Sequence, residues 1–85
     1  MAEYKVYFKK SVWKDFKSIP DKDLSNILQC IEELGGDPRR PGSKKLTGQE
    51  RYRYRVGKYR ILYSIQDKEL TIWVVKVGYR KEVYR

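Results

Sequence analysis

The stretch RYRYRVGKYR, residues 51–60, holds four arginines and one lysine and decides how the rest of the chain folds. Charged residues alternate with tyrosine and valine before Gly57-Lys58, and the alternation continues through YRILYSI, residues 59–65. Such a period of two is typical of strands. Glycine at the first central position fits a type II′ two-residue turn. The stretch therefore predicts a β-hairpin in which Val56 pairs with Tyr59 and Arg55 pairs with Arg60.

Side chains on successive strand residues point to opposite faces, so this register predicts two unlike surfaces. The apolar face consists of Tyr52, Tyr54, Val56, Tyr59, Ile61, Tyr63 and Ile65. The opposite face carries Arg51, Arg53, Arg55 and Arg60. Like charges directly opposed across strands destabilise a sheet, by up to about 1 kcal/mol. A bound polyanion would relieve this repulsion through charge-assisted hydrogen bonds. The alternative is an ordinary solvated basic face.

Segments before the hairpin predict one strand and two helices. Residues 3–9 alternate as a strand does, and Ser11 is the expected N-cap of a short helix that ends at Pro20. A second helix is expected to begin at Asp21 or Asp23 and to stop at Gly35-Gly36. Its predicted apolar face follows helical spacing and comprises Leu24, Ile27, Leu28, Ile31 and Leu34.

The last strand is expected over residues 70–77, after a tight turn at Asp67-Lys68 and before Gly78, which permits a bend or bulge. Without a bulge, the alternation places Trp73 and Val75 on the arginine face, as a small core or as a platform for a base or a partner helix. The whole pattern predicts one α+β domain over residues 1–85. An antiparallel four-stranded sheet would carry an N-terminal helical hairpin on one face, in the order β-α-α-β-β-β.

Charge and composition narrow the class of function. The chain has a net charge of +9, and residues 41–85 contribute +8 of it. This asymmetry favours a polyanion or an acidic protein as partner. Histidine is absent and Cys30 is the single cysteine. No zinc site, metal-binding motif or cofactor is therefore predicted. With no apolar segment of roughly 20 residues and no signal peptide, the expected compartment is the cytoplasm.

Three motifs in order, KKLTG, YRYRVGKYRILY and VVKVGYRKEVYR, resemble the RelE branch of the RelE/ParE toxin superfamily, and the likeness covers essentially the whole chain. The resemblance implies a RelE-like fold and a type II toxin–antitoxin toxin. It also implies a metal-independent endoribonuclease that cuts mRNA in the A site of the 70S ribosome by attack of the 2′-OH. A co-encoded acidic antitoxin would neutralise the toxin.

The resemblance also implies roles for individual residues. Arg60 and Arg80 would bind the scissile phosphate, while Arg53 and Arg55 would bind the RNA backbone. Tyr84 would stack on a base or help to move a proton. Further residues expected to bind RNA are Arg51, Lys44, Lys45, Lys58, Tyr79 and Lys81.

The chain departs from many relatives in two ways. Arginine stands at positions 53 and 55, where some have lysine, and Tyr79 stands where many have histidine. The general base therefore stays open between Tyr84, Glu82 and ribosomal RNA groups, and the activity is expected to be weak. Two other functions stay open, namely a ParE-like inhibitor of DNA gyrase that cleaves nothing and a non-catalytic RNA-binding module.

Overall fold

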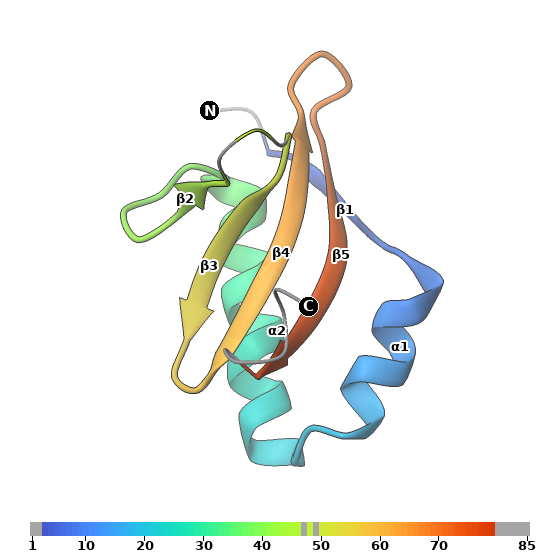
Figure 1. The fold of residues 1–85 in the computed structure, drawn as a ribbon. Helices are drawn as coiled ribbons and strands as arrows, with labels where there is room; N and C mark the ends of the chain where they lie inside the picture. Colours follow the sequence, from blue (N-terminus) through green and yellow to red (C-terminus); the bar gives the residue numbers. More distant parts are fainter. Residues whose placement is uncertain (1–2, 47, 49, 80–85) are drawn as a thin grey trace.

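The computed structural model describes residues 3–46, 48 and 50–79, and Figure 1 shows their arrangement as one sheet with two helices against it. In chain order the elements are β1 (Lys5–Phe8), α1 (Lys10–Lys17), α2 (Asp21–Gly36), β2 (Lys44–Lys45), β3 (Tyr52–Val56), β4 (Tyr59–Gln66) and β5 (Thr71–Tyr79). The predicted α+β class is confirmed. In the view of Figure 1, α2 lies behind the sheet, so the reader looks onto the face without helices, called the open face below.

The sheet differs from the prediction in strand number and direction. Five strands lie in the order β1-β5-β4-β3-β2. β1 pairs with β5 in parallel, whereas the other neighbours are antiparallel. The expected antiparallel four-stranded sheet was therefore wrong on both counts. The chain between β1 and β5 contains both helices and strands β2 to β4, so it is long enough for the crossover that parallel strands require.

The central hairpin has the predicted register. Val56 pairs with Tyr59, and Arg55 pairs with Arg60. Gly57 has a φ of 58°, a left-handed conformation that glycine adopts without strain. Lys58 is not among the residues with positive φ, as a type II′ turn requires.

The second hairpin, between β4 and β5, is looser than predicted. The last pair is Gln66 with Thr71, so four residues, not Asp67-Lys68 alone, form the loop. Leu70 closes it with a φ of 49°, which is uncommon for a residue with a side chain. Strand β5 does not end before Gly78, but runs through it to Tyr79.

A register shift in the β4–β5 pair changes which residues of β5 face the helices. Leu62 pairs with Lys76, but Tyr63 pairs with Val74, so Val75 is an extra residue in β5. Such a bulge reverses the alternation beyond it. Val74 and Val77 are consequently both buried in the core, three residues apart.

The helices begin and end close to the predicted residues. α1 starts at Lys10 with Lys9 as N-cap, so the expected cap Ser11 lies inside the first turn instead. α2 starts at Asp21, directly after Pro20, and includes both glycines at its end. Gly35 packs against β1, since a Cβ there would lie 3.2 Å from the carbonyl oxygen of Tyr4.

One continuous core fills the space between the helices and the sheet. Its central members are Val12, Phe16, Ile19, Ile27, Ile31, Leu34, Tyr59, Ile61, Tyr63, Ile72, Val74 and Val77. Leu28 was predicted on this apolar face but is 42% exposed. Burying these side chains supplies most of the favourable free energy of folding. Within the described part of the chain, neither helix is long and apolar enough to cross a membrane.

Candidate nucleic-acid interface

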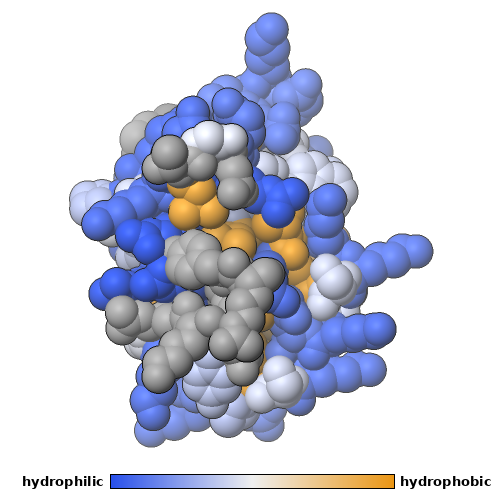
Figure 2. All heavy atoms as spheres, in the orientation of Figure 1, coloured by the Kyte–Doolittle hydropathy of each residue, from blue (hydrophilic) through white to orange (hydrophobic). Residues whose placement is uncertain are grey.

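The arginines of the central hairpin lie together on the open face, as the sequence predicted. Arg53 pairs with Leu62, and Arg55 lies directly opposite Arg60, so all three side chains emerge from the face that the helices leave uncovered. Arg60 is only 7% exposed, whereas Arg55 is exposed. Each of the three also interacts within the protein. Figure 2 shows this face with strongly hydrophilic residues around a smaller hydrophobic area.

The short strand β2 widens this basic surface. Lys44 pairs with Arg53 at the edge of the sheet. A hollow of about 290 Å³ lies there, lined by Gly42, Lys44, Arg53, Tyr54 and Arg55. Lys44, Arg53 and Arg55 therefore border a concave surface that can receive the backbone of a polyanion.

A second and larger hollow lies on the open face around Trp73. It measures about 520 Å³ and is lined by Lys9, Glu50, Arg51, Ser64, Gln66, Trp73 and Val75. Trp73 was expected on the arginine face, and its pairing with Ser64 confirms this. Its ring stacks on that of Tyr7, with centroids 5.2 Å apart and an angle of 28° between the planes. The sequence did not single out Tyr7, Ser64 or Gln66, because their proximity to Trp73 depends on the strand order.

Two lysines predicted to bind RNA lie away from the row formed by Arg53, Arg55 and Arg60, called the arginine row below. Lys45 pairs with Tyr52 and lies 3.7 Å from the carboxylate of Glu50. Lys58 occupies the hairpin turn and helps to line a hollow of about 300 Å³ with Asp23. These two lysines therefore lie at the rim of the basic surface.

Tyr79 packs with the core side of the sheet. It pairs with Tyr59, and the two rings stack with centroids 4.9 Å apart. The hydroxyl of Tyr59 donates a hydrogen bond of 3.1 Å to Asp23. Hydrogen bonding with Tyr79, burial and the Asp23 carboxylate together raise the pKa of Tyr59 above its ordinary value. Tyr79 is 47% exposed, and a role in RNA binding would have to use this exposed part of the residue.

Arg80, Lys81 and Tyr84 lie outside the described residues, and so does Glu82. Of the predicted catalytic residues, the structure therefore describes Arg53, Arg55 and Arg60, and the catalytic roles of all five residues, Arg80 and Tyr84 included, stay predictions from the family resemblance.

Two other arginines have a structural role at the end of the sheet. Arg39 donates hydrogen bonds of 3.0 and 2.8 Å to the two carboxylate oxygens of Asp67. The Tyr4 hydroxyl donates a third, of 2.7 Å. The hydrogen bonds from Arg39 and then from Tyr4 lower the pKa of Asp67 to about 2. Arg40 pairs with Glu33 and lies over the ring of Tyr54. These contacts hold loop 37–43 against the sheet, so Arg39 and Arg40 both stabilise the fold.

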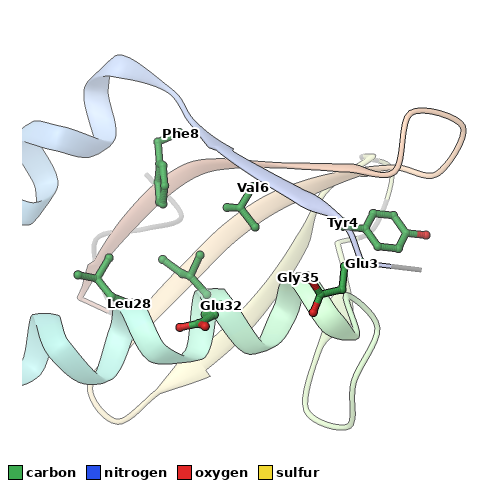
Figure 3. A pocket seen from close by; sticks show the side chains of 8 residues that line it. Glu3, Tyr4, Val6, Phe8, Leu28, Glu32 and Gly35 are labelled. Atoms are coloured by element: carbon green, nitrogen blue, oxygen red, sulfur yellow. The ribbon is translucent and has the colours of Figure 1, made fainter. Parts of the chain in front are cut away.

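A further hollow lies on the other side of the molecule, between β1 and α2 (Figure 3). Val6 and Phe8 point into it from β1, and Leu28 and Glu32 border it from α2, with a volume of about 320 Å³. Glu3 also lines it. Its two carboxylates give it the opposite charge to the open face, so it does not belong to a surface for phosphates.

The part of the chain that the structure describes contains no cluster of side chains that could bind a metal ion. No three Cys, Asp or Glu side chains come together there in a way that could hold an ion. Cys30 is partly buried beside the core, and burial raises the pKa of its thiol, as expected for a packing residue.

Comparison with known proteins identifies the family to which the sequence and the fold are similar. The family described as "ParE toxin of type II toxin-antitoxin system, parDE" matches residues 6–84. Toxin RelG of Mycobacterium tuberculosis is 29% identical over 96% of this chain and 97% of its own length. Putative toxin RelE1 of Methanocaldococcus jannaschii is 30% identical over 98% of this chain and 97% of its own.

A solved structure agrees with the fold as well. The crystal structure of the toxin–antitoxin complex RelBE2 from Mycobacterium tuberculosis contains a chain that superposes with a TM-score of 0.84 at 27% identity. The match covers 93% of this chain and all of that one.

Proposed function

The chain belongs to the family of ParE toxins of type II toxin–antitoxin systems, within the RelE branch of the RelE/ParE superfamily, and on this premise we propose that it is a ribosome-dependent endonuclease of mRNA. The observation that carries the proposal is the arginine group on the open face. Arg55 and Arg60 are held directly opposite each other, with Arg53 two residues along β3. Like charges directly opposed across strands usually weaken a sheet, whereas the phosphates of an RNA backbone would make this arrangement favourable.

The chemistry requires no metal ion. The 2′-OH of one nucleotide attacks the adjacent phosphorus, so that an O2′–P bond forms and the P–O5′ bond breaks. The products are a 2′,3′-cyclic phosphate and a 5′-OH, with one proton leaving O2′ and one arriving at O5′. Arginines can align the phosphate and stabilise the negative charge that develops on its oxygens.

Among the described residues, Arg60 is the best candidate to bind the scissile phosphate. It is nearly buried, so its guanidinium is held in place before RNA arrives and loses little freedom on binding. Arg53 and Arg55 would contact the neighbouring backbone. Arginine cannot readily give up a proton, so proton transfer falls to another group, with Tyr84, Glu82 and ribosomal RNA as the candidates.

Primer extension on a translated message tests this function. The intact chain should produce cuts within codons, and Arg60→Ala should reduce cleavage by about 10²–10³-fold, the usual cost of losing one charge-stabilising donor. Arg60→Lys keeps the charge and should restore part of the activity. Lys17→Ala removes an exposed cation from α1 and should cleave like the intact chain. Thermal denaturation of each variant separates lost chemistry from lost folding.

A second candidate function follows from the name of the matching family. ParE-like chains inhibit DNA gyrase without cutting RNA, and the match to the ParE family favours this alternative. The same assay distinguishes the two. Intact mRNA together with arrested DNA replication would replace the nuclease by a gyrase inhibitor. RNA binding without cleavage or growth arrest would indicate a non-catalytic binding module.

We also propose an acidic cognate antitoxin as partner. The similar chain of known structure is bound in a toxin–antitoxin complex, and the +8 charge of residues 41–85 would attract an acidic segment. The antitoxin could cover the arginines or displace the C-terminal segment. Co-purification with the product of a neighbouring short gene is the test, and protection of Arg55 from a guanidinium-modifying reagent would show that the antitoxin covers the open face.

A further inference from the structure

The hollow around Trp73 carries an inference that rests on the proposed function and extends it. We infer that this hollow is a stacking subsite for one nucleobase of the RNA, next to the position where the backbone is cut. Its flat wall is the Trp73 ring, and its rim is formed by hydrogen-bonding and cationic side chains.

The orientation of the Trp73 ring suits it to stacking. Tyr7 stacks on Trp73, with centroids 5.2 Å apart, and thereby fixes the ring before a ligand arrives. Tyr7 does not line the hollow, so the stack with Tyr7 and the hollow use different parts of Trp73. Trp73 is still 38% exposed, although indole rings are usually buried. An exposed aromatic ring held by a second ring is the platform on which proteins stack unpaired bases.

The rest of the lining indicates that the hollow binds a nucleobase and not an apolar side chain of a protein. Ser64 and Gln66 of β4 offer a hydroxyl and an amide, and Glu50 offers a carboxylate that can accept from an exocyclic amino group. The ion pair of Glu50 with Lys45 is long, at 3.7 Å, and largely exposed, so it leaves Glu50 available. A base needs a flat apolar contact together with polar groups at its edges, and this hollow provides both.

The position of the hollow connects it with the arginine row. Arg51 lines the hollow and precedes Arg53 by two residues on the same side of the chain. Along β4, Ser64 lies four residues beyond Arg60, which is roughly 13 Å at the rise of a strand. About two extended nucleotides span that distance. Lys9 at the end of β1 supplies a second cation for a phosphate on the far side.

Tryptophan fluorescence tests the subsite directly, because the chain has only two tryptophans. Trp13→Phe leaves Trp73 as the single reporter and preserves the aromatic packing of α1 with Phe8 and Phe16. The probe is a six-nucleotide single-stranded RNA with 2′-O-methyl groups, which cannot be cleaved. It should quench Trp73 in a saturable way. An abasic oligomer of the same length supplies the phosphates without bases and should bind without comparable quenching.

Variants of the ring measure its contribution to binding. Trp73→Ala should weaken binding of the same RNA by roughly 5- to 150-fold, the range that corresponds to the loss of one base–aromatic stack. Trp73→Phe should retain most of the affinity, and its remaining Trp13 should not be quenched. Circular dichroism verifies that each variant is folded.

The outcomes separate this inference from the nuclease proposal. If Trp73→Ala binds the RNA as tightly as the intact chain while mRNA is still cut, the subsite is refuted and the nuclease stands. If RNA quenches Trp73 but no message is cut, the subsite stands and the nuclease falls. If an acidic peptide quenches Trp73 and RNA does not, the hollow is a protein-docking surface and the inference is wrong.

Discussion

The two faces of the sheet are formed by alternate residues of the same strands, yet different forces act on them. On the helix-covered face, Ile61 and Tyr63 are fully buried and contribute to one continuous core. On the open face, Arg55 and Arg60 oppose each other at the next register position. The first face stabilises the domain, whereas the second brings like charges together, an arrangement that usually weakens a pair of strands. The residues proposed to bind RNA therefore lie within one residue of the positions that form the core.

The covered face should show the largest effect of a single substitution. Ile61→Ala is expected to lower the free energy of unfolding by about 2–5 kcal/mol, since it removes a fully buried side chain and leaves a cavity. Ile61→Val should cost only about 0.5–1.5 kcal/mol and keep the chain folded for measurement. Urea denaturation gives both values. Gln66→Ala, at the exposed end of the same strand, should change stability by less than about 0.5 kcal/mol. Equal effects of Ile61→Ala and Gln66→Ala would contradict the assignment of the faces.

Two neighbouring glycines sharpen the comparison at the contact between α2 and β1. Gly36→Ala should raise stability by about 0.5–1 kcal/mol, because alanine favours a helix and no atom lies within 4 Å of its Cβ. Gly35→Ala should lose this gain. Its Cβ would lie 3.2 Å from the Tyr4 carbonyl oxygen and 3.4 Å from Val6. Thermal denaturation of the pair reports the difference, and equal gains would show that β1 can move away from α2.

The open face should respond to substitution much less than the covered face. Arg55→Gln is expected to change the free energy of unfolding by no more than about 1 kcal/mol, since it removes a like-charge repulsion with Arg60 together with the contacts that Arg55 makes within the protein. The same variant should weaken RNA binding and lower its salt dependence, because one phosphate contact is lost. Denaturation and a salt titration of RNA affinity measure the two effects. A variant that loses stability and binds RNA unchanged would reverse the roles assigned to this face.

The smallest effect is expected at the end of the sheet, in the loop between β4 and β5, and it depends on pH. The pKa of Asp67 is lowered to about 2 in the folded chain, below the ordinary value near 3.9, so its charged form stabilises the fold above that value. This contribution is lost as the pH falls from about 4 towards 2. Asp67→Asn should remove that part of the acid sensitivity, as thermal denaturation at several pH values can show. Glu69→Gln in the same loop serves as the control and should leave the profile unchanged.

Local patterns in the sequence were enough for the central hairpin. The period of two in residues 51–65 and the Gly57-Lys58 turn predicted every pair that the structure shows between β3 and β4. The same reasoning placed four arginines on one face, namely Arg51, Arg53, Arg55 and Arg60. Both results depend on near neighbours in the chain, where turn length and side-chain alternation determine the geometry.

Long-range contacts were the part that the sequence could not supply. The parallel pairing of β1 with β5 joins residues more than sixty positions apart, and alternation gives no information on strand order. The bulge at Val75 and the exposure of Leu28 likewise depend on which neighbours pack against β5 and α2. The hollow around Trp73 was missed as a group for the same reason, since its lining comes from four segments of the chain.

The turn at Gly57-Lys58 also restricts how this protein can change over evolution. A single inserted or deleted residue there would shift one strand of the hairpin by one position and exchange its inward and outward side chains. Arginines would then enter the space under the helices while tyrosines met solvent. Homologues are therefore expected to vary in residue type along this hairpin but to keep its length, whereas the four-residue loop before β5 can differ in length between lineages.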